Sequence, residues 1–297
     1  MRQKILLIAG IGHSGSTMLD LVLGGHPQVR GGGEVSKVLR TPLAEYPRRY
    51  EQGSCSCGAR PVDCSFWSDS LSWLKDHQAD TVEQKYDAFI RHFQQQYGDN
   101  KILLDSSKTV RPFMAYLHEH YDVRVIFLVR DIRSWVNSRR SQEGKGVLSL
   151  MMRWKRGNQR TERFLKRHNM ATLTLGYEEL ALYPEIMLQK VCDFAGIDYT
   201  PAMLDVQNSQ SHIIRGNNLR ADPEKKAKIR YDARWMVSPR LMAWGPLFWF
   251  FMAANRRWVY SHFITGRSKA FGVRQDDVML FGCKRKETVS KALQGRA

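Results

Sequence analysis

One short stretch near the amino terminus constrains the fold more than any other part of the chain. Residues Ile5 to Ala9 form a continuous apolar run that leads into the glycine-rich sequence Gly10-Ile-Gly-His-Ser-Gly-Ser-Thr17. Such a run is typical of a strand that is buried on both faces in a parallel sheet. A helix is predicted from Thr17 to Gly24, because a second glycine and then Pro27 follow it. The stretch therefore predicts a strand, a loop and a helix of the kind that holds phosphate.

The same alternation continues along the chain. Further strands are predicted over Ile102–Leu104, Val123–Val129 and Thr172–Leu175. Helices are predicted over Val110–His120, Ile132–Ser141, Leu148–Arg167 and Pro184–Ala195. Strands that alternate with helices favour an α/β class: a three-layer, P-loop-like fold with a central parallel sheet flanked by helices.

Two regions depart from this alternation. An insertion at about 36–100 carries three cysteines and one predicted helix, Ser70–Tyr97, inside an α/β domain that we expect to span residues 1–235. Residues 236–297 form an aromatic and basic extension. Its most apolar part, Leu241–Val259, is broken by glycine and proline and is too short for a bilayer span of roughly 20 residues. We favour packing of this part on the core, and the alternative is a membrane interface.

The net charge narrows the choice of partners. The chain has 46 Lys and Arg against 29 Asp and Glu, a net charge of +17, which favours anionic ligands, polyanions or an acidic membrane surface. Because the basic residues are spread along the chain without a nucleic-acid-binding motif, no specific nucleic acid is expected, and a basic nucleic-acid-binding protein is kept only as an alternative. Five cysteines fit a reducing compartment, and the first strand is too short for a signal peptide. The expected location is cytoplasmic, with peripheral contact at the inner membrane surface as an option.

The glycine-rich loop matches the spacing of an ATP-binding P-loop except that Ser16 stands in the place of the lysine. The loss of that lysine argues against triphosphate chemistry, although a kinase or NTPase with a degenerate loop stays an alternative. What remains is an anion cradle: Gly12 and Gly15 let the backbone N–H groups turn inward, and Ser14, Ser16 and Thr17 add hydroxyl donors. A purely structural turn is the other interpretation.

A second motif lies in Val123–Ser141. Arg130 ends a predicted buried strand, and Ser138 follows eight residues later on the predicted helix. A guanidinium at a strand end can bind phosphate through two hydrogen bonds, and a hydroxyl two turns into the helix can face the same crevice. The alternative is a surface ion pair between Arg130 and Asp131.

These motifs together resemble the sulfotransferases that use 3′-phosphoadenosine 5′-phosphosulfate (PAPS). The first loop is similar to their 5′-phosphosulfate loop, although His13 stands where lysine or arginine is usual. Its charge near neutral pH then depends on an upward pKa shift caused by the bound anion. Arg130 and Ser138 resemble the family's 3′-phosphate site. The resemblance covers roughly Lys4 to Arg220.

A late segment, Ser211–Arg220, is similar to the H-x-x-x-G-N-x-x-R segment of many bacterial sulfotransferases, in which a loop closes over the nucleotide. The resemblance implies that Arg215, Gly216, Asn217 and Arg220 contribute to the nucleotide site. Gly216 allows a tight turn there, and the arginines can reach phosphate.

Two further residues are candidates for catalysis, beside His13. Glu34 follows His13 by 21 residues, an interval that resembles the one before the catalytic glutamate of tyrosylprotein sulfotransferases, so it is the predicted general base. The alternative is that Glu34 caps the next helix or pairs with Lys37. Lys108 follows a predicted strand and is expected to neutralise the bridging oxygen as the S–O bond breaks, with a solvated lysine as the alternative.

The predicted activity is transfer of a sulfuryl group from PAPS to a hydroxyl or amine, with 3′-phosphoadenosine 5′-phosphate (PAP) as the second product and no metal. The acceptor stays open among a glycan, a lipid, a peptide and a small-molecule hydroxyl. Cys55, Cys57 and Cys64 form C-x-C-x6-C, with His77 further on. Reduced cysteines are the favoured interpretation, followed by a local disulfide and then a metal site.

Overall fold

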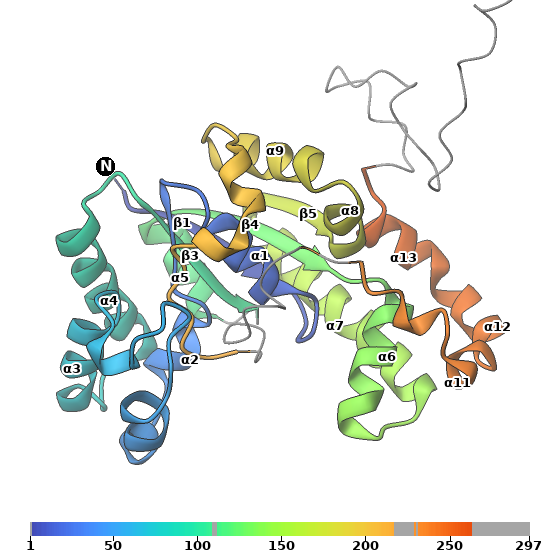
Figure 1. The fold of residues 1–297 in the computed structure, drawn as a ribbon, viewed down its shortest axis with the longest axis horizontal. Helices are drawn as coiled ribbons and strands as arrows, with labels where there is room; N and C mark the ends of the chain where they lie inside the picture. Colours follow the sequence, from blue (N-terminus) through green and yellow to red (C-terminus); the bar gives the residue numbers. More distant parts are fainter. Residues whose placement is uncertain (1, 109–111, 217–228, 230, 263–297) are drawn as a thin grey trace, which may run out of the picture. The chain divides into compact units, whose positions relative to one another are not determined.

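A five-stranded sheet organises the chain, as the computed structural model in Figure 1 shows. The structure describes residues 2–108, 112–216, 229 and 231–262. All neighbouring strands are parallel, in the order β2-β3-β1-β4-β5. The strands are β1 Lys4–Ala9, β2 Val29–Gly31, β3 Ile102–Lys108, β4 Asp122–Val129 and β5 Thr172–Gly176. The α/β class predicted from the sequence, a central parallel sheet flanked by helices, is confirmed.

Strand β1 lies in the middle of the sheet. Its residue Leu6 is in register with Leu104 of β3 on one side and with Arg124 of β4 on the other. The chain thus adds β2 and β3 on one side of β1 before it adds β4 and β5 on the other side. Ligands of open α/β sheets bind where the strand order reverses in this way, beyond the carboxyl ends of the strands. That position is the end of β1.

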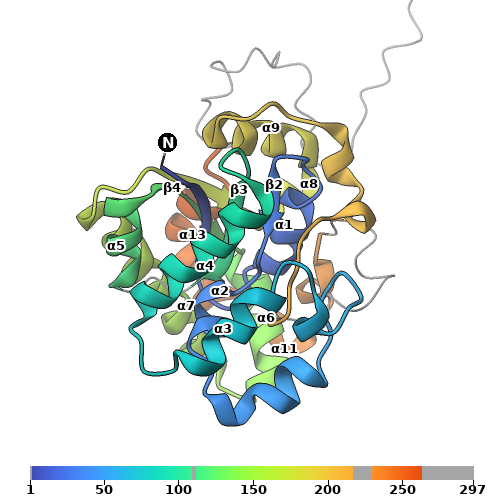
Figure 2. The ribbon, with the colours of Figure 1, turned by 90° about the vertical axis from the view of Figure 1, so that its left-hand side faces the viewer.

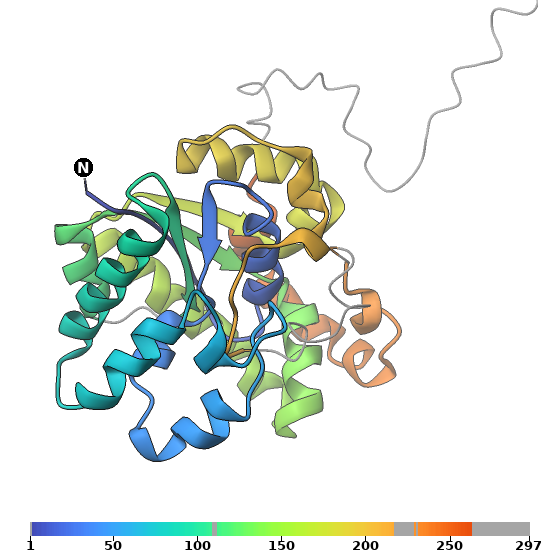
Figure 3. The ribbon, with the colours of Figure 1, turned by 60° about the vertical axis from the view of Figure 1, so that its left-hand side comes forward.

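The sheet is buried on both faces. Alternate residues of β1, namely Ile5, Leu7 and Ala9, belong to one core cluster with side chains of the helices α4, α5 and α7. The buried residues of α1 and α9 lie outside that cluster; α1 packs over β2 and β3, and α9 over β4 and β5. Figure 3 shows α1 side by side with the edge strand β2, both in blue. Burial of both faces explains why β1 reads as an unbroken apolar run.

The helices have the following bounds: α1 Ser16–Leu23, α2 Val35–Leu39, α3 Ser68–Asp76, α4 Val82–Tyr97, α5 Phe113–His120, α6 Ile132–Glu143, α7 Val147–Arg167, α8 Tyr177–Leu182, α9 Pro184–Ala195, α11 Pro239–Met242, α12 Gly245–Phe248 and α13 Met252–Val259. Short helical turns are η1 Leu43–Glu45, η2 Pro47–Glu51, η3 Pro61–Asp63, η4 Pro201–Leu204, η5 Val206–Asn208, η7 Ala233–Trp235 and η8 Trp249–Phe251.

One prediction on the elements was wrong, and one strand was missed. The single helix expected over Ser70–Tyr97 is the pair α3 and α4, because Thr81 caps a new helix: its hydroxyl accepts from Gln84 N at 3.3 Å and Gln84 Oε1 accepts from Thr81 N at 2.8 Å. Strand β2 was not predicted, since three residues are too few to form a pattern. For the helix predicted from Val110, the described part is Phe113–His120, and residues 109–111 lie outside the description.

The carboxyl-terminal stretch packs on the α/β core. Phe248, Phe251 and Trp258 belong to the core cluster, and the compact unit extends to Ser261. In Figure 1, α3 and α4 lie at the opposite end of the sheet from α11 to α13, and Figure 2 looks from the side of α3 and α4. No helix within the described ranges is both long enough and apolar enough to cross a bilayer. Residues 263–297 of the predicted extension lie outside the description.

Candidate active site

The glycine-rich loop leaves β1 and enters α1, and side chains donate to three of its carbonyl groups. Trp135 Nε1 donates to Gly12 O at 2.7 Å, Arg130 Nη1 donates to His13 O at 3.1 Å, and Ser14 Oγ donates to Ile11 O at 2.8 Å. The first N–H groups of a helix have no partner within that helix, so the amides of α1 point out of its amino end. Carbonyls held in this way and a helix amino end are the arrangement that anion-binding loops use.

Two features of the chain hold the loop in this shape. Gly15, the residue before α1, has φ 93°, and a Cβ at this position would lie 2.3 Å from the ring of Tyr177. His13 also has a left-handed backbone, with φ 70°. The hydroxyl residues Ser14, Ser16 and Thr17 are all buried beneath the loop or at the start of α1. Gly15 therefore cannot be replaced without strain and a collision.

Arg130 lies at the carboxyl end of β4, directly beside this loop. Besides its bond to the carbonyl of His13, its guanidinium forms an ion pair with Asp232 and lies over the ring of Tyr177 at 5.4 Å. Its Nε is buried and has no hydrogen-bond partner among the described residues. The guanidinium is therefore fixed next to the glycine-rich loop.

The alternative pairing of Arg130 with Asp131 does not occur. Asp131 is fully buried and accepts from Arg133 Nη2 at 2.6 Å and from Asn255 Nδ2 at 2.8 Å. Although burial raises the pKa of Asp131, the contacts with Arg133 outweigh burial and hold it below its usual value. Asp131 thus anchors helix α6 to α13, and Arg130 is directed toward the loop.

Helix α6 presents two rows of side chains toward the site. Ser134 Oγ donates to Asp232 O at 3.3 Å, and Ser138 lies one turn further along the same face. Trp135 and, one turn on, Arg139 face the loop, since the first bonds Gly12 and the second lowers the pKa of His13. The structure therefore places Ser138 on the face of α6 that looks toward the Asp232–Arg130 pair.

Glu34 and Lys108 are in direct contact. Lys108 Nζ pairs with Glu34 Oε1, and Lys37 Nζ pairs with Oε2 at 2.5 Å. Residues 32 and 33 run alongside β3, where Gly32 N donates to Leu104 O at 2.9 Å, and this brings Glu34 to the end of that strand. Burial acts to raise the pKa of Glu34, but Lys108 and then Lys37 outweigh it and lower the pKa below its usual value. The carboxylate is therefore ionised at neutral pH.

Lys108 also touches the loop. Gly10 N donates to Lys108 O at 2.8 Å, and Lys108 has a left-handed backbone with φ 67°. Its side chain is only 14% exposed, so it is not a solvated surface lysine. The suggested pairing of Glu34 with Lys37 is real, but it exists alongside the contact with Lys108. Because β3 and β4 flank β1, Lys108 and Arg130 lie on either side of the same loop.

His13 is neutral in the structure at physiological pH. Burial is the main cause that lowers its pKa to about 4, and the nearby charges of Arg139, Lys108 and Arg130 lower it further. A bound anion acts in the opposite direction, because it stabilises the imidazolium. A bound anion therefore has to raise the pKa of His13 from this lowered value before the imidazole is charged at neutral pH.

The late segment reaches the loop through Gly216. A Cβ on this residue would lie 3.6 Å from Thr17 Oγ1, and its φ of 137° suits glycine. Arg215 is directed elsewhere: its Nη1 donates to Thr41 Oγ1 at 2.6 Å and to Lys37 O at 3.2 Å. The other two residues predicted for this segment, Asn217 and Arg220, lie outside the described residues.

Comparison with known proteins bears on the family. Residues 6–201 match the model of the family described as "Sulfotransferase family". The chain belongs to the sulfotransferase family. Among solved structures, the sulfotransferase domain from the curacin biosynthetic pathway has 19% identity and a TM-score of 0.51, covering 79% of this chain and 89% of that one. This likeness supports the shared fold.

Two further solved structures are similar at lower scores. The sulfotransferase domain of the Synechococcus PCC 7002 olefin synthase has a TM-score of 0.46 at 19% identity, covering 80% of this chain and 90% of that one. Sulfotransferase STF9 from Mycobacterium avium has a TM-score of 0.43 at 14% identity, covering 86% of this chain and 77% of that one. The comparison with curated proteins found no match.

Several site residues of this sulfotransferase were missed in the sequence. Tyr177 packs against Gly15, Asp232 pairs with Arg130, and Arg139 adds a positive charge near His13. Arg139 could have been predicted, because it follows Trp135 by one helical turn in the predicted helix. Tyr177 and Asp232 had no local signal, since each meets the site from a segment far along the chain.

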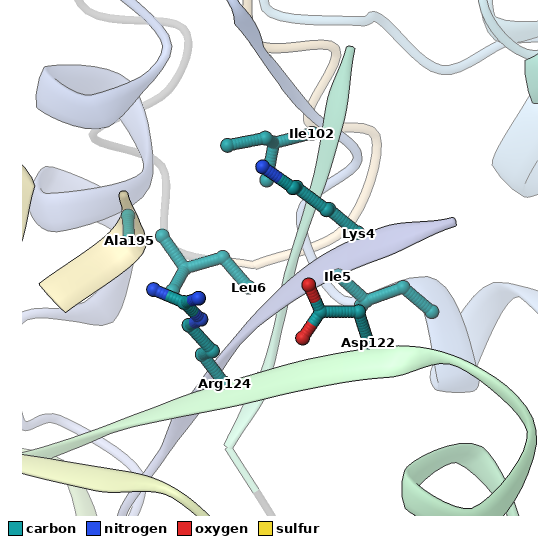
Figure 4. A pocket seen from close by; sticks show the side chains of 7 residues that line it. All are labelled: Lys4, Ile5, Leu6, Ile102, Asp122, Arg124 and Ala195. Carbon is teal, nitrogen blue, oxygen red and sulfur yellow. The ribbon is translucent and has the colours of Figure 1, made fainter. Parts of the chain in front are cut away.

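The opposite edge of the sheet carries a small pocket. Figure 4 shows its lining side chains, among them Lys4, Asp122 and Arg124 at the amino ends of β1 and β4. Its volume of about 10 Å³ has room for about one water molecule. A larger pocket of about 590 Å³ shares Asp122 and Arg124 with it and is also lined by Tyr121 and Phe194.

Proposed function

We propose that this sulfotransferase moves a sulfuryl group from PAPS to a hydroxyl or amine and releases PAP. The observation that carries the proposal is the hydrogen bond of 3.1 Å between Arg130 Nη1 and His13 O. It means that the predicted 3′-phosphate anchor and the predicted 5′-phosphosulfate loop lie side by side at one edge of the sheet. A single adenosine bisphosphate can then bridge the two.

The residues present suit such a nucleotide. The guanidinium of Arg130 can donate to the 3′-phosphate in place of Asp232, and Ser138 lies on the adjacent face of α6. The amides at the start of α1 and the hydroxyls of Ser16 and Thr17 suit the 5′-phosphate. Asp232 has to give up or share Arg130 when the phosphate arrives, because a carboxylate and a phosphate compete for the same donors.

Each catalytic group has one role. Glu34 accepts the proton of the acceptor hydroxyl or amine as the new bond to sulfur forms. Lys37 is 48% exposed on its side chain, so the acceptor can replace it at Glu34 Oε2. Lys108 stabilises the negative charge on the bridging oxygen as the S–O bond breaks. His13 can add to this once the bound anion has raised its pKa enough to protonate the imidazole. PAPS supplies the activated sulfuryl group, and this transfer needs no metal ion.

The proposal is tested by incubating the full chain with PAPS and a panel of glycans, lipids, peptides and small-molecule hydroxyls and following product mass. The expected result is one acceptor class that gains a sulfuryl group while PAP accumulates in equal amount. Glu34→Gln is the paired control. Turnover of ATP with magnesium, without any transfer from PAPS, would instead indicate a nucleotide kinase or NTPase.

We also propose peripheral contact with an anionic bilayer through the carboxyl-terminal helices. Trp249 and Phe250 are 76% and 77% exposed, and Arg256 and Arg257 are exposed on the next helix. Exposed aromatic rings beside arginines suit an interface of apolar chains and anionic headgroups. Sedimentation with anionic vesicles should fall for Trp249→Ser with Phe250→Ser and should stay unchanged for Leu182→Ser, an exposed apolar residue on α8. Equal sedimentation of all three proteins would refute the contact.

A further inference from the structure

Three cysteines and one histidine meet between the insertion and the late segment. Cys64 Sγ lies 3.7 Å from Cys57 Sγ, 3.7 Å from Cys55 Sγ and 3.2 Å from His212 Nδ1. The four ligand atoms all lie within 4.8 Å of one another. His212 is 148 residues from Cys64, so the fold has to bring the fourth member to the other three.

These separations suit a tetrahedral metal site. With Zn–S bonds of about 2.3 Å and Zn–N bonds of about 2.0–2.1 Å, a tetrahedron places two sulfurs about 3.8 Å apart and a sulfur and a nitrogen about 3.5 Å apart. The sulfur pairs at 3.7 Å are far beyond a bonded pair at about 2.05 Å, so the cysteines are not a disulfide. Weak thiol hydrogen bonds can hold two sulfurs at this separation. They do not explain the convergence of four ligand atoms.

The backbone around the cysteines is shaped for the cluster. Gly58 N donates to Cys55 O at 3.0 Å and closes a tight turn over Cys55–Gly58, in which Gly58 has φ 94°. Cys55 N donates to Ala59 O at 2.8 Å, and Trp67 N donates to Cys64 O at 2.8 Å. These bonds fix the backbone that carries the two buried cysteines.

His212 is held as firmly as the cysteines. Its ring stacks on Phe66 with centroids 5.0 Å apart, and Trp67 Nε1 donates to its carbonyl at 2.6 Å. Its neighbour Ile213 forms two hydrogen bonds with Ser56. Ile213 N donates to Ser56 Oγ at 2.8 Å, and Ser56 N donates to Ile213 O at 3.1 Å. His77, the histidine suggested by the sequence, stacks on Trp73 instead.

We propose that Cys55, Cys57, Cys64 and His212 bind one structural zinc ion. Three thiolates and an imidazole complete a tetrahedron and leave no open position, as in structural rather than catalytic zinc sites. Soft sulfur ligands in this geometry select zinc over magnesium or calcium. This site is separate from the sulfuryl transfer, which uses no metal in the proposed mechanism.

The zinc ion would fasten the late segment to the insertion. Ser211 pairs with β2 at Gly31, and Gly216 lies against Thr17 of the phosphate loop. A metal link at His212 therefore limits how far the start of this segment can move from the loop. This consequence rests on the proposed function, whereas the metal site itself does not.

The site is tested by metal analysis of the full chain purified without a histidine tag. About one zinc per chain is expected, with at least a tenfold loss of zinc affinity in Cys57→Ser, measured by competition with a chromophoric chelator. Cys57 is exposed, so serine leaves no cavity in the core. Cys192→Ala is the matched control, because Cys192 lies against Met203 away from the cluster and should keep its zinc.

Cobalt replacement distinguishes bound metal from loss of folding. The native chain with Co²⁺ should show thiolate-to-cobalt charge-transfer bands and the intense visible bands of a tetrahedral site. Cys57→Ser should lose intensity in the charge-transfer bands while its circular dichroism stays native. A chain with no bound metal, whose Cys55, Cys57 and Cys64 react with a thiol reagent equally fast with and without added zinc, would overturn the proposal.

Calorimetry with PAP tests the nucleotide site independently of the zinc site. Zinc bound at one equivalent without any affinity for PAP would leave the metal site standing and refute the nucleotide site. Tight PAP binding by a chain that binds no zinc would do the reverse. With both correct, removal of zinc by a chelator should weaken PAP binding severalfold while the zinc-loaded chain binds normally.

Discussion

Substitution of Arg130 by alanine tests the predicted 3′-phosphate anchor without knowledge of the acceptor. The guanidinium of Arg130 is buried at the end of β4, bonds the carbonyl of His13 and pairs with Asp232. In the proposed complex it exchanges the carboxylate for the 3′-phosphate of PAP. The variant should therefore bind PAP more weakly than the native chain.

The size of the loss follows from the contacts. A hydrogen bond to a charged group contributes about 1.5–3 kcal/mol. Because Arg130 already has a partner in Asp232, only the difference between the two partners counts, and the lower end of about 1.5–2 kcal/mol applies. At 1.4 kcal/mol per factor of ten, the Kd for PAP should rise about 10- to 30-fold.

Isothermal titration calorimetry with two ligands gives the measurement its specificity. Adenosine 5′-monophosphate lacks the 3′-phosphate, so its Kd should change less than about twofold. Arg124→Ala is the matched control, because it removes one guanidinium at the opposite edge of the sheet. It should leave both affinities unchanged, and melting temperatures should show that both variants are folded.

Two results would refute the reasoning. Unchanged PAP affinity in folded Arg130→Ala would remove the anchor. Equal losses for PAP and adenosine 5′-monophosphate would show that Arg130 acts by holding the carbonyl of His13, and so the shape of the loop, rather than by binding the 3′-phosphate.

Three further predictions concern single residues of the site. Glu34→Gln should leave the Kd for PAP within about threefold and lower kcat by roughly 10²–10⁴-fold, the usual contribution of a general base; normal turnover would exclude this role. Asp232→Asn should tighten PAP binding by up to about tenfold in calorimetry, because the carboxylate competes for Arg130, and weaker binding would contradict the competition. His13 has a pKa of about 4 in the folded chain against 6.5 when unfolded, so the unfolded state binds more protons between these values and the free energy of unfolding falls as pH drops through that range. His13→Asn, which tolerates the left-handed backbone, should show a shallower fall in urea titrations, and an identical slope would exclude the lowered pKa.

The parts of the fold that the sequence predicted are those with local signals. A strand buried on both faces leaves an unbroken apolar run, so β1 and β4 could be predicted. Both ends of helix α9 were also predicted correctly. Helices α3 and α4 are separate because Thr81 caps the start of α4, and the apolar pattern gives no sign of this cap. Strand β2 forms because it pairs with β3 and not because of its own residues.

The candidate site divides in the same way. The loop and Arg130 were recognisable because each lies at the end of a readable strand, and parallel strands end at one edge. Contacts between distant segments left no pattern: the pairing of Glu34 with Lys108 and of Arg130 with Asp232 depends on the strand order. His212 shows this most clearly, since its partners are in the insertion and the sequence suggested His77.

The most direct test of the central claim is the structure of this chain bound to PAP. The account predicts one nucleotide at the carboxyl end of β1, with the 5′-phosphate on the amides at the start of α1 and the 3′-phosphate in hydrogen-bond contact with Arg130. A nucleotide bound elsewhere, or bound through the loop with its 3′-phosphate turned away from Arg130, would contradict it.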